Sequence, residues 1–363
     1  MLFTYRPVPH KMKQMHDFIT FIFLEVWCNA PSNEYSLGLF ERNSTCHRIM
    51  DELFLRDLAG KLDAKGAACY FYKGVNAIYS EFKSLTSAEI AEYRDQFEQN
   101  NRIEELCRND ADTTPIHYAS LNPAKTELNE EIAKFFKGLY SSGFFDLAFV
   151  KDILGSTLSE YYREFVDQDH DNNHDTCPFC GIMPLDGEFD PTRDAFDHYL
   201  PKGTYPFNAL NLKNLAPSCN KCNSGHKLAQ DPLHNADKQR RKAFYPFSTT
   251  PPDVSVTVSF TSDDWTRRRH DSVNVQVDSS TFPEETATWK ELFGIEKRYA
   301  AKCCSKNGGV DWQNRVVNEC MNYSLTPQDM LEAELASAAN APWVQCNFLK
   351  RAFLESLNRS GLI

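Results

Sequence analysis

The sequence predicts an α+β protein, in which a helical N-terminal region, a cysteine-bearing central segment and a C-terminal hairpin with helices follow one another. Three observations lead to this prediction. Apolar residues recur at helical spacing from about residue 10 to 167, two Cys-x-x-Cys pairs lie in a segment rich in Pro, Gly, Asn and Lys, and alternating apolar residues mark two later strands. We therefore divide the chain into residues 1–168, 169–250 and 251–363.

Length and charge limit the classes of protein that fit. The chain has 363 residues, 42% of them hydrophobic, which is enough to bury a full core. Its formal charge of −11 excludes an overall basic field, so any contact with a polyanion must be local. The apolar run at residues 18–27 contains Glu25 and lacks the layout of a signal peptide. We expect a cytoplasmic protein with no membrane partner.

The N-terminal region shows helix start signals but no motif that reveals its role. Thr86 and Glu89 form the Thr-x-x-Glu pattern of a capping box, and a further helix is expected from Asn122 to a stop near Gly138. The polar stretch at residues 170–176 breaks the helical periodicity and marks the transition to the central segment.

The C-terminal region begins with two alternating segments and returns to helical spacing. Residues 253–260 and 272–277 alternate apolar and polar side chains, which predicts a β-hairpin. Helical spacing then recurs at residues 284–302 and 327–357.

Four of the twelve cysteines form two Cys-x-x-Cys pairs, Cys177 with Cys180 and Cys219 with Cys222, separated by 38 residues. Two such pairs supply four soft thiolate ligands for one tetrahedral zinc ion. A closed four-thiolate site leaves no open position for water, so the expected zinc is structural and other residues must carry any chemistry. The alternative is a chance pairing of reduced cysteines, and the other eight are expected to be buried or idle thiols.

Polar residues within FDHYLPKGTYPFNALNLKNLAPSCNKCNSGHK, residues 196–227, add a second pattern. Asp197 and His198 are followed by a proline, Asn214 lies sixteen residues after the histidine and precedes a leucine, and Asn223 directly follows the last cysteine. Together these marks resemble the HNH or ββα-metal endonucleases, in the subtype whose hairpin and helix are stapled by a four-cysteine zinc site. The resemblance covers the central segment only and implies a zinc-stapled HNH nuclease module at residues 169–250.

The resemblance also implies a role for each of these residues in phosphodiester hydrolysis. His198 matches the general base, a task that suits a neutral imidazole near pH 7. Asp197 and Asn223 match the positions that hold the catalytic cation, and their oxygen donors favour Mg²⁺ or Mn²⁺. Asn214 matches the central asparagine, which ties the loop together and helps orient the histidine. The family often has a histidine where this chain has Asn223, although the asparagine variant also occurs.

Further candidates lie close to this pattern. His226 could add a ligand or a phosphate contact, and Lys202, Lys221 and Lys227 could meet phosphates, although each could equally be solvated surface. Residues 198–245 carry eight basic and two acidic side chains, a local net charge of +6. Such a patch is the electrostatic footprint of a polyanion partner. We expect nucleic acid, with DNA ahead of RNA.

Acidic stretches flank the basic patch. Residues 160–197 carry eleven acids against two arginines, and residues 86–135 carry eleven acids against five basic side chains. Acidic helices that border the site would repel duplex DNA over about 8 Å at physiological salt. We therefore expect a weak nuclease that a partner, such as an ATPase, activates. The alternative is that these acids are ordinary solvated helix faces.

Two other functional classes were compared with the nuclease. Zinc nucleobase deaminases place a glutamate two residues after the histidine, where this chain has Leu200, so that class is excluded. A non-catalytic zinc module that binds nucleic acid or protein remains the alternative, because it needs the cysteines and the basic patch but not the polar set. The sequence pattern around the site, DHYLPK, YP and CNKCN, resembles HNH proteins of bacterial defence islands, which are sometimes encoded beside an ATPase. This resemblance implies a role in antiviral defence.

Overall fold

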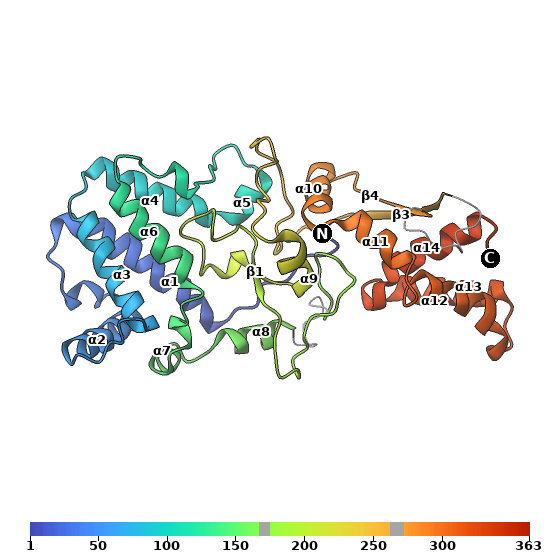
Figure 1. Cartoon of the computed structure of the whole chain (residues 1–363), viewed down its shortest axis with the longest axis horizontal. Coiled ribbons are helices and arrows are strands. Elements are labelled where there is room, and N and C mark those ends of the chain that lie inside the picture. The colour runs from blue at the N-terminus through green and yellow to red at the C-terminus, as the bar shows by residue number, and fades with distance from the viewer. Residues whose placement is uncertain (167–174, 262–271) are drawn as a thin grey trace.

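A computed structural model describes residues 1–166, 175–261 and 272–363. The boundary predicted between residues 168 and 169, and most of the predicted break at 170–176, lie outside the described residues. The chain runs from N-terminal helices through a central segment to the C-terminal region (Figure 1). The described part is mostly helical and has two small two-stranded sheets, which confirms the α+β class.

The N-terminal region is helical, as predicted. Its α-helices are α1 (Gln14–Phe21), α2 (Ser44–Leu58), α3 (Ala67–Phe82), α4 (Ser87–Asn101), α5 (Ile103–Arg108), α6 (Thr126–Leu139), α7 (Ala148–Leu154) and α8 (Leu158–Val166). The predicted capping box opens α4, where the Glu89 amide donates to Thr86 Oγ1 at 3.3 Å and the Glu89 carboxylate accepts from the Thr86 amide at 2.8 Å. Helix α6 begins later than predicted, because Asn122 caps a turn instead: its side chain accepts from the Ala124 amide.

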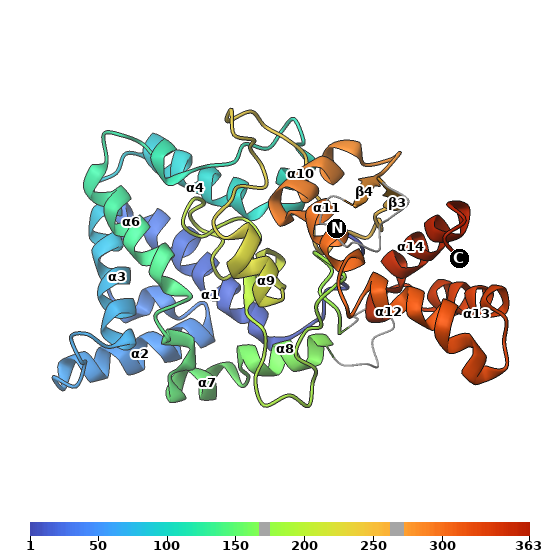
Figure 2. The same ribbon diagram turned by 45° about the vertical axis from the view of Figure 1, so that its right-hand side comes forward.

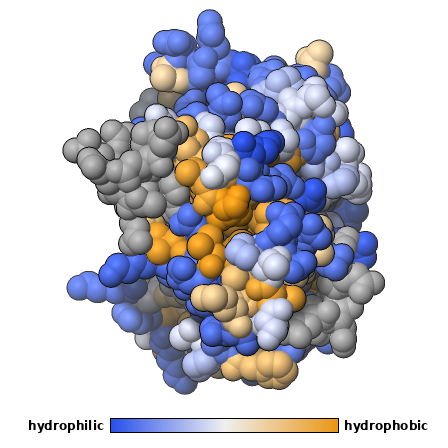
Figure 3. Space-filling model, turned by 90° about the vertical axis from the view of Figure 1, so that its right-hand side faces the viewer, coloured by the Kyte–Doolittle hydropathy of each residue, from blue (hydrophilic) through white to orange (hydrophobic). Residues whose placement is uncertain are grey.

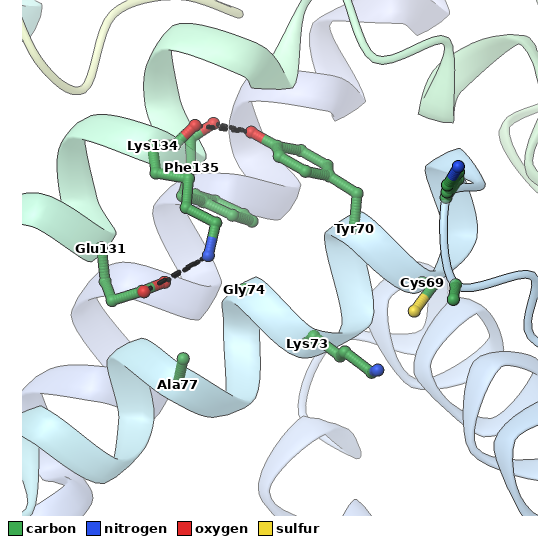
Figure 4. A pocket seen from close by; sticks show the side chains of 10 residues that line it. Cys69, Tyr70, Lys73, Gly74, Ala77, Glu131, Lys134 and Phe135 are labelled. Carbon is green, nitrogen blue, oxygen red and sulfur yellow. Dashed lines mark hydrogen bonds and ion pairs between the residues drawn. The ribbon is translucent and has the colours of Figure 1, made fainter.

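Helices α3 and α6 approach each other closely where each carries a glycine. A Cβ atom on Gly74 would overlap the ring of Phe135, and one on Gly138 would overlap Tyr70. The Tyr70 hydroxyl donates to the Lys134 carbonyl at 2.8 Å, and a cavity of about 350 Å³ opens beside these side chains (Figure 4). Among the described residues, none of the four cysteines predicted to bind zinc lines this cavity.

The central segment has a strand, strand, helix order. Strands β1 (Phe196–His198) and β2 (Leu215–Pro217) pair antiparallel with Asp197 opposite Ala216. Helix α9 (Asn220–Cys222) follows directly and continues as a π-helical turn over residues 223–227. The helix therefore begins three residues before Asn223.

Both flanking regions contact the central segment. The Leu2 amide donates to the Pro178 carbonyl at 3.1 Å, and the Tyr5 hydroxyl donates to the Pro217 carbonyl at 2.7 Å. Phe207, in the loop between β1 and β2, adopts a positive φ of 79° and packs its ring against Phe23 and Phe136 of the N-terminal region. Helix α9 lies between the N-terminal helices and the C-terminal helices in both ribbon views (Figure 2). The buried apolar residues of all three regions form one continuous core.

The C-terminal region contains the predicted hairpin, followed by helices. Strands β3 (Ser255–Phe260) and β4 (Val273–Asp278) pair antiparallel with Val258 opposite Val275. The helices are α10 (Pro283–Phe293), α11 (Ile295–Cys303), α12 (Gly309–Asn314), α13 (Pro327–Asn340) and α14 (Asn347–Arg359). The two ranges of predicted helical spacing each contain two helices, and Gly294, at a φ of 59°, separates α10 from α11.

The C-terminal end of the molecule presents apolar side chains among polar ones (Figure 3). A cavity of about 490 Å³ lies between β3, α13 and α14, and Val256, Trp343 and Phe348 line part of it. Among the described residues, no helix has the length and apolar character needed to cross a membrane.

Candidate active site and cysteine cluster

The four predicted cysteine ligands come together. Their sulfur atoms all lie within 4.8 Å of one another, and all four residues are buried. The sulfurs of Cys180 and Cys219 are 4.0 Å apart. A tetrahedral zinc ion with Zn–S bonds of about 2.3 Å would hold its ligands about 3.8 Å apart, so the donor set fits a structural zinc ion.

The first cysteine pair is shaped by a tight turn that requires glycine. Gly181 has a φ of 62°, and its amide donates to the Cys177 carbonyl at 2.7 Å. A Cβ atom at this position would overlap Leu2 and Phe348, which pack on the turn from opposite ends of the chain. The turn is therefore sterically held by both flanking regions.

The C-terminal helices complete the environment of the cysteines. The guanidinium of Arg298 donates to the Cys222 sulfur at 3.3 Å, Trp289 Nε1 donates to the Phe179 carbonyl at 2.8 Å, and the Tyr299 hydroxyl donates to the Cys180 carbonyl at 3.0 Å. Hydrogen bonds from the neighbouring thiols, together with the charge of Arg298, hold the pKa of Cys180 well below its usual value. This positive charge offsets part of the negative charge that four thiolates leave on a zinc site.

His198 lies at the end of β1, half-buried beneath the end of helix α6. Its ring meets the ring of Tyr140 edge to face, with 4.6 Å between centroids, and its Nε2 lies 3.0 Å from the Ala209 carbonyl. A carbonyl only accepts hydrogen bonds, so Nε2 must carry the proton and Nδ1 must carry the lone pair. Burial first, and then the charge of Lys202, lower the pKa of His198 to about 3, so the ring is neutral at pH 7.

Asn214 closes the loop between β1 and β2, which contains the Ala209 carbonyl. Its side-chain oxygen accepts from the Leu200 amide at 2.7 Å, while its Nδ2 donates to the Leu200 carbonyl at 3.0 Å and to Asn208 Oδ1 at 3.3 Å. The side chain is fully buried. Asn214 therefore joins the two ends of the loop, which is the geometry that its expected positioning role requires.

The same loop is attached to helix α4 by further buried amides. Asn208 Nδ2 donates to the Asn100 carbonyl at 3.3 Å, Asn100 Nδ2 donates to the Pro206 carbonyl at 3.0 Å, and Asn211 Nδ2 donates to Asn101 Oδ1 at 3.0 Å. These contacts flank Ala209 on both sides. The N-terminal region thus has a structural role in the site, because it holds the loop that orients His198.

Asp197 is buried and paired with a residue that was expected to be a phosphate contact. Lys227 Nζ lies 3.0 Å from Asp197 Oδ1 and donates to the His198 carbonyl at 2.9 Å. The side chains of Lys227 and Asp197 are 0% and 3% exposed. Lys227 is therefore an internal counter-ion. The phosphate contact predicted for this residue is not possible in this structure, because its ammonium is out of reach of a bound polyanion.

The fit of a catalytic cation to these residues is partial. Asp197 Oδ2 has no hydrogen-bond partner, so one carboxylate oxygen is unpaired, but like the Lys227 ammonium it is shielded from solvent. The ammonium of Lys227 already supplies a positive charge to the other oxygen. Asn223 is half-buried on the helix next to Cys222, a candidate zinc ligand, and no described contact joins its side chain to Asp197.

The remaining candidates take different positions. The ring of His226 lies against Gly294 in the C-terminal region, where a Cβ atom would be 3.2 Å from its Nδ1. Lys202 is half-buried and donates to Ser141 Oγ at 3.1 Å, and burial lowers its pKa. Lys221 is exposed. Of the basic side chains counted in the patch, four are exposed: Lys213, Lys221, Lys238 and Lys242.

Sequence reasoning missed several residues of the site. Tyr140, the Ala209 carbonyl and Arg298 reach it from distant or unpatterned positions, and no local signal marks them. A second group of ligand types, His117, Asp231 and His234, also gathers in space. Two of its members are close in sequence, but His117 lies more than a hundred residues away.

Comparisons with protein-family models, with curated proteins and with solved structures find no match to this chain. The functional assignment therefore depends on the geometry of the site.

Proposed function

We propose that this chain is a metal-dependent endonuclease that hydrolyses phosphodiester bonds in nucleic acid, with DNA as the expected substrate. The observation that carries the proposal is the commitment of His198 Nε2 to the Ala209 carbonyl. This contact fixes the tautomer and the ring orientation, so that Nδ1 is the basic atom. His198 lies at the end of the first strand of a strand, strand, helix unit that also carries two of the clustered cysteines. The HNH resemblance implies this setting for the general base.

In this mechanism His198 removes a proton from the attacking water. A general base works best with a pKa near the operating pH, so the mechanism requires the negative charge of a bound phosphate to raise the pKa of His198 from about 3. The proton moves to Nδ1, and the carbonyl of Ala209 stabilises the positive charge that the ring then carries. Tyr140 covers one edge of the ring and Asn214 holds the loop, so the base keeps a single orientation. A divalent cation, Mg²⁺ or Mn²⁺, held through Asp197 Oδ2 and Asn223 would stabilise negative charge on the phosphate and the leaving oxygen.

Exposed lysines support a polyanionic substrate. Lys221 lies on the helix that follows the hairpin, and Lys213 lies at the entry to β2, so both present charge from the segments that carry the candidate site. Positive charge of this kind binds the phosphate backbone without reading sequence. The proposal therefore specifies a backbone-directed nuclease and leaves sequence preference open.

The test is nicking of supercoiled plasmid DNA by the full chain, with Mg²⁺ or Mn²⁺ and with chelator. We expect cleavage only with the cation, and a His198→Ala variant should be slower by about 10²-fold or more, because a general base contributes at least that factor. His47→Ala is the matched control, since His47 lies on α2 outside the site. A His198→Ala variant that cuts at the wild-type rate would remove this residue from the mechanism.

A non-catalytic zinc-stabilised module that binds nucleic acid or protein is the second candidate, and the buried pair of Lys227 and Asp197 favours it. An internal ammonium already neutralises the carboxylate that a catalytic cation would need. Binding of DNA in a gel-shift assay, with no cleavage of DNA or RNA under any divalent cation, would identify this alternative.

We also propose that a partner, an ATPase of an antiviral defence system, regulates the nuclease. Helix α4 carries many of the acids in residues 86–135 and contacts the site loop through Asn100 and Asn101. Several of these acids are paired within the region, including Asp112 with Arg102 and Glu89 with Lys125. We expect the isolated chain to cleave slowly, and addition of an activating partner to raise the rate.

A further inference from the structure

Two histidines and one aspartate converge where two loops meet. His117 ends the loop after α5, and Asp231 and His234 belong to the loop after the π-helical turn. Their ligand atoms all lie within 4.8 Å of one another: His234 Nδ1 is 2.8 Å and His117 Nε2 is 3.7 Å from Asp231 Oδ2. The group contains none of the residues assigned to the nuclease site or the cysteine cluster.

His234 Nδ1 and Asp231 Oδ2 are within hydrogen-bonding distance at 2.8 Å, whereas His117 Nε2 lacks a partner. His117 Nε2 is buried and has no hydrogen-bond partner. If it carries a proton, its 3.7 Å separation from Asp231 Oδ2 is too long for a good hydrogen bond. If it carries the lone pair, it faces a carboxylate oxygen and the two repel. A cation between the two atoms would satisfy both.

The ligand types and spacing suit a borderline divalent metal. Two imidazoles and one carboxylate are ligands that zinc commonly takes in sites that keep an open position. Zinc bonds of about 2.0–2.1 Å to nitrogen and oxygen place tetrahedral ligand atoms about 3.3 Å apart. The two measured separations, 2.8 and 3.7 Å, bracket that value, so small side-chain movements would close the group around an ion.

The aspartate is already held in place for this task. Its second oxygen, Oδ1, accepts from the Tyr205 hydroxyl at 2.6 Å and from the Leu233 amide at 2.8 Å. Hydrogen bonds of this kind orient the ligating carboxylate in metal sites. The carbonyl of Asp231 also accepts from Arg241 at 2.9 Å. Only Oδ2 remains directed at the two histidines.

The surroundings leave room for an exchangeable ligand. The side chains of His117, Asp231 and His234 are 35%, 20% and 16% exposed, in contrast to the fully buried cysteines. A cavity of about 320 Å³ lies beside His234, with Thr113 and Arg240 in its lining. The charge of Arg240 opposes a cation, but its guanidinium is directed to the carbonyls of Leu106 and Leu233.

We propose that His117, Asp231 and His234 form a second metal site that binds Zn²⁺ with at least one position open to water. The bound ion would join the N-terminal region to the loop after α9. Through Tyr205, it would also hold the β1–β2 loop that presents Ala209 to His198. The proposal is independent of the nuclease assignment, because it depends on ligand geometry alone.

The test loads the full chain with Zn²⁺, removes unbound metal by gel filtration, and measures zinc content and the zinc X-ray absorption spectrum. Wild type should bind about two zinc ions per chain, with one shell of sulfur at about 2.3 Å and one of nitrogen and oxygen at about 2.0–2.1 Å. His117→Ala and His234→Ala should each lose about one zinc ion and most of the nitrogen and oxygen shell, while the sulfur shell remains.

Asp231→Asn and His47→Ala complete the design. Asp231→Asn keeps the size of the side chain and an acceptor for Tyr205 but weakens the ligand, so it should lose the same zinc ion even if a histidine variant is poorly folded. His47→Ala should keep both ions. A wild-type protein with about one zinc ion and sulfur ligands only, or variants that retain the second ion, would overturn the proposal.

Discussion

Replacement of Lys227 by methionine would leave the carboxylate of Asp197 buried without its cation. Both side chains are essentially inaccessible to solvent, and the same ammonium also satisfies the His198 carbonyl. Removal of one member of a buried ion pair typically costs about 3–5 kcal/mol, since the remaining charge stays desolvated. Methionine has a similar length, so loss of packing adds little. We expect Lys227→Met to lower the free energy of unfolding by about 3–5 kcal/mol at pH 7.

Urea denaturation followed by tryptophan fluorescence measures this loss. Lys221→Met is the matched control, because Lys221 is an exposed lysine on the same helix and its change should fall within about 0.5 kcal/mol. A double variant, Asp197→Asn with Lys227→Met, should recover part of the stability because no buried charge remains. If Lys227→Met is as stable as Lys221→Met, the pair contributes little and our reading of Lys227 as an internal counter-ion is wrong.

Three further predictions concern zinc, the loop and acid stability. Cys219→Ser should lose zinc and unfold, because metal binding contributes to folding. Cys69→Ser should keep its zinc and its fold, and elemental analysis would show the difference. Asn214→Ala should lower the free energy of unfolding by about 2–4 kcal/mol, since it leaves buried partners unsatisfied; a loss below about 0.5 kcal/mol in urea denaturation would contradict this. Burial lowers the pKa of His16 to about 4, so the unfolded chain binds more protons at this residue, and His16 should contribute a loss of about 3 kcal/mol of stability as pH drops from about 6.5 to 4. Thermal melts should show a smaller loss in His16→Phe, and an equal loss would refute the assignment to His16.

Patterns that act over short distances along the chain were predicted well. The spacing of the cysteine pairs identified four side chains that meet in space, since a Cys-x-x-Cys turn brings its own sulfurs together and one contact between the two turns completes the set. The alternation at residues 253–260 and 272–277 predicted β3 and β4 within two residues at each end. The capping box at Thr86 was confirmed because it depends only on residues within one turn.

Features that depend on tertiary packing could not be predicted from these patterns. Lys227 resembles a surface lysine in the sequence. Only the packing of the π-helical turn after α9 against β1 places its ammonium next to Asp197. The contact that fixes His198 is made by a backbone carbonyl, which has no side-chain signature. The apolar spacing at residues 327–357 predicted helical structure but not the break between α13 and α14.

The N-terminal region illustrates the same limit. Its helices could be expected, but not its attachment to the loop through Asn100 and Asn208, because buried asparagines carry no period in the sequence. A chain that begins near Ser159 would lose these contacts together with Tyr140.

Chemical rescue of His198→Gly tests the central claim most directly. Plasmid nicking by this variant is measured with Mg²⁺ at increasing concentrations of free imidazole, beside wild type and a chelator control. We predict activity reduced by about 10²-fold or more without imidazole and restored in proportion to added imidazole, because the small base can occupy the space beside Tyr140. A His198→Gly variant that cleaves at the wild-type rate without imidazole would contradict the assignment of His198 as the general base.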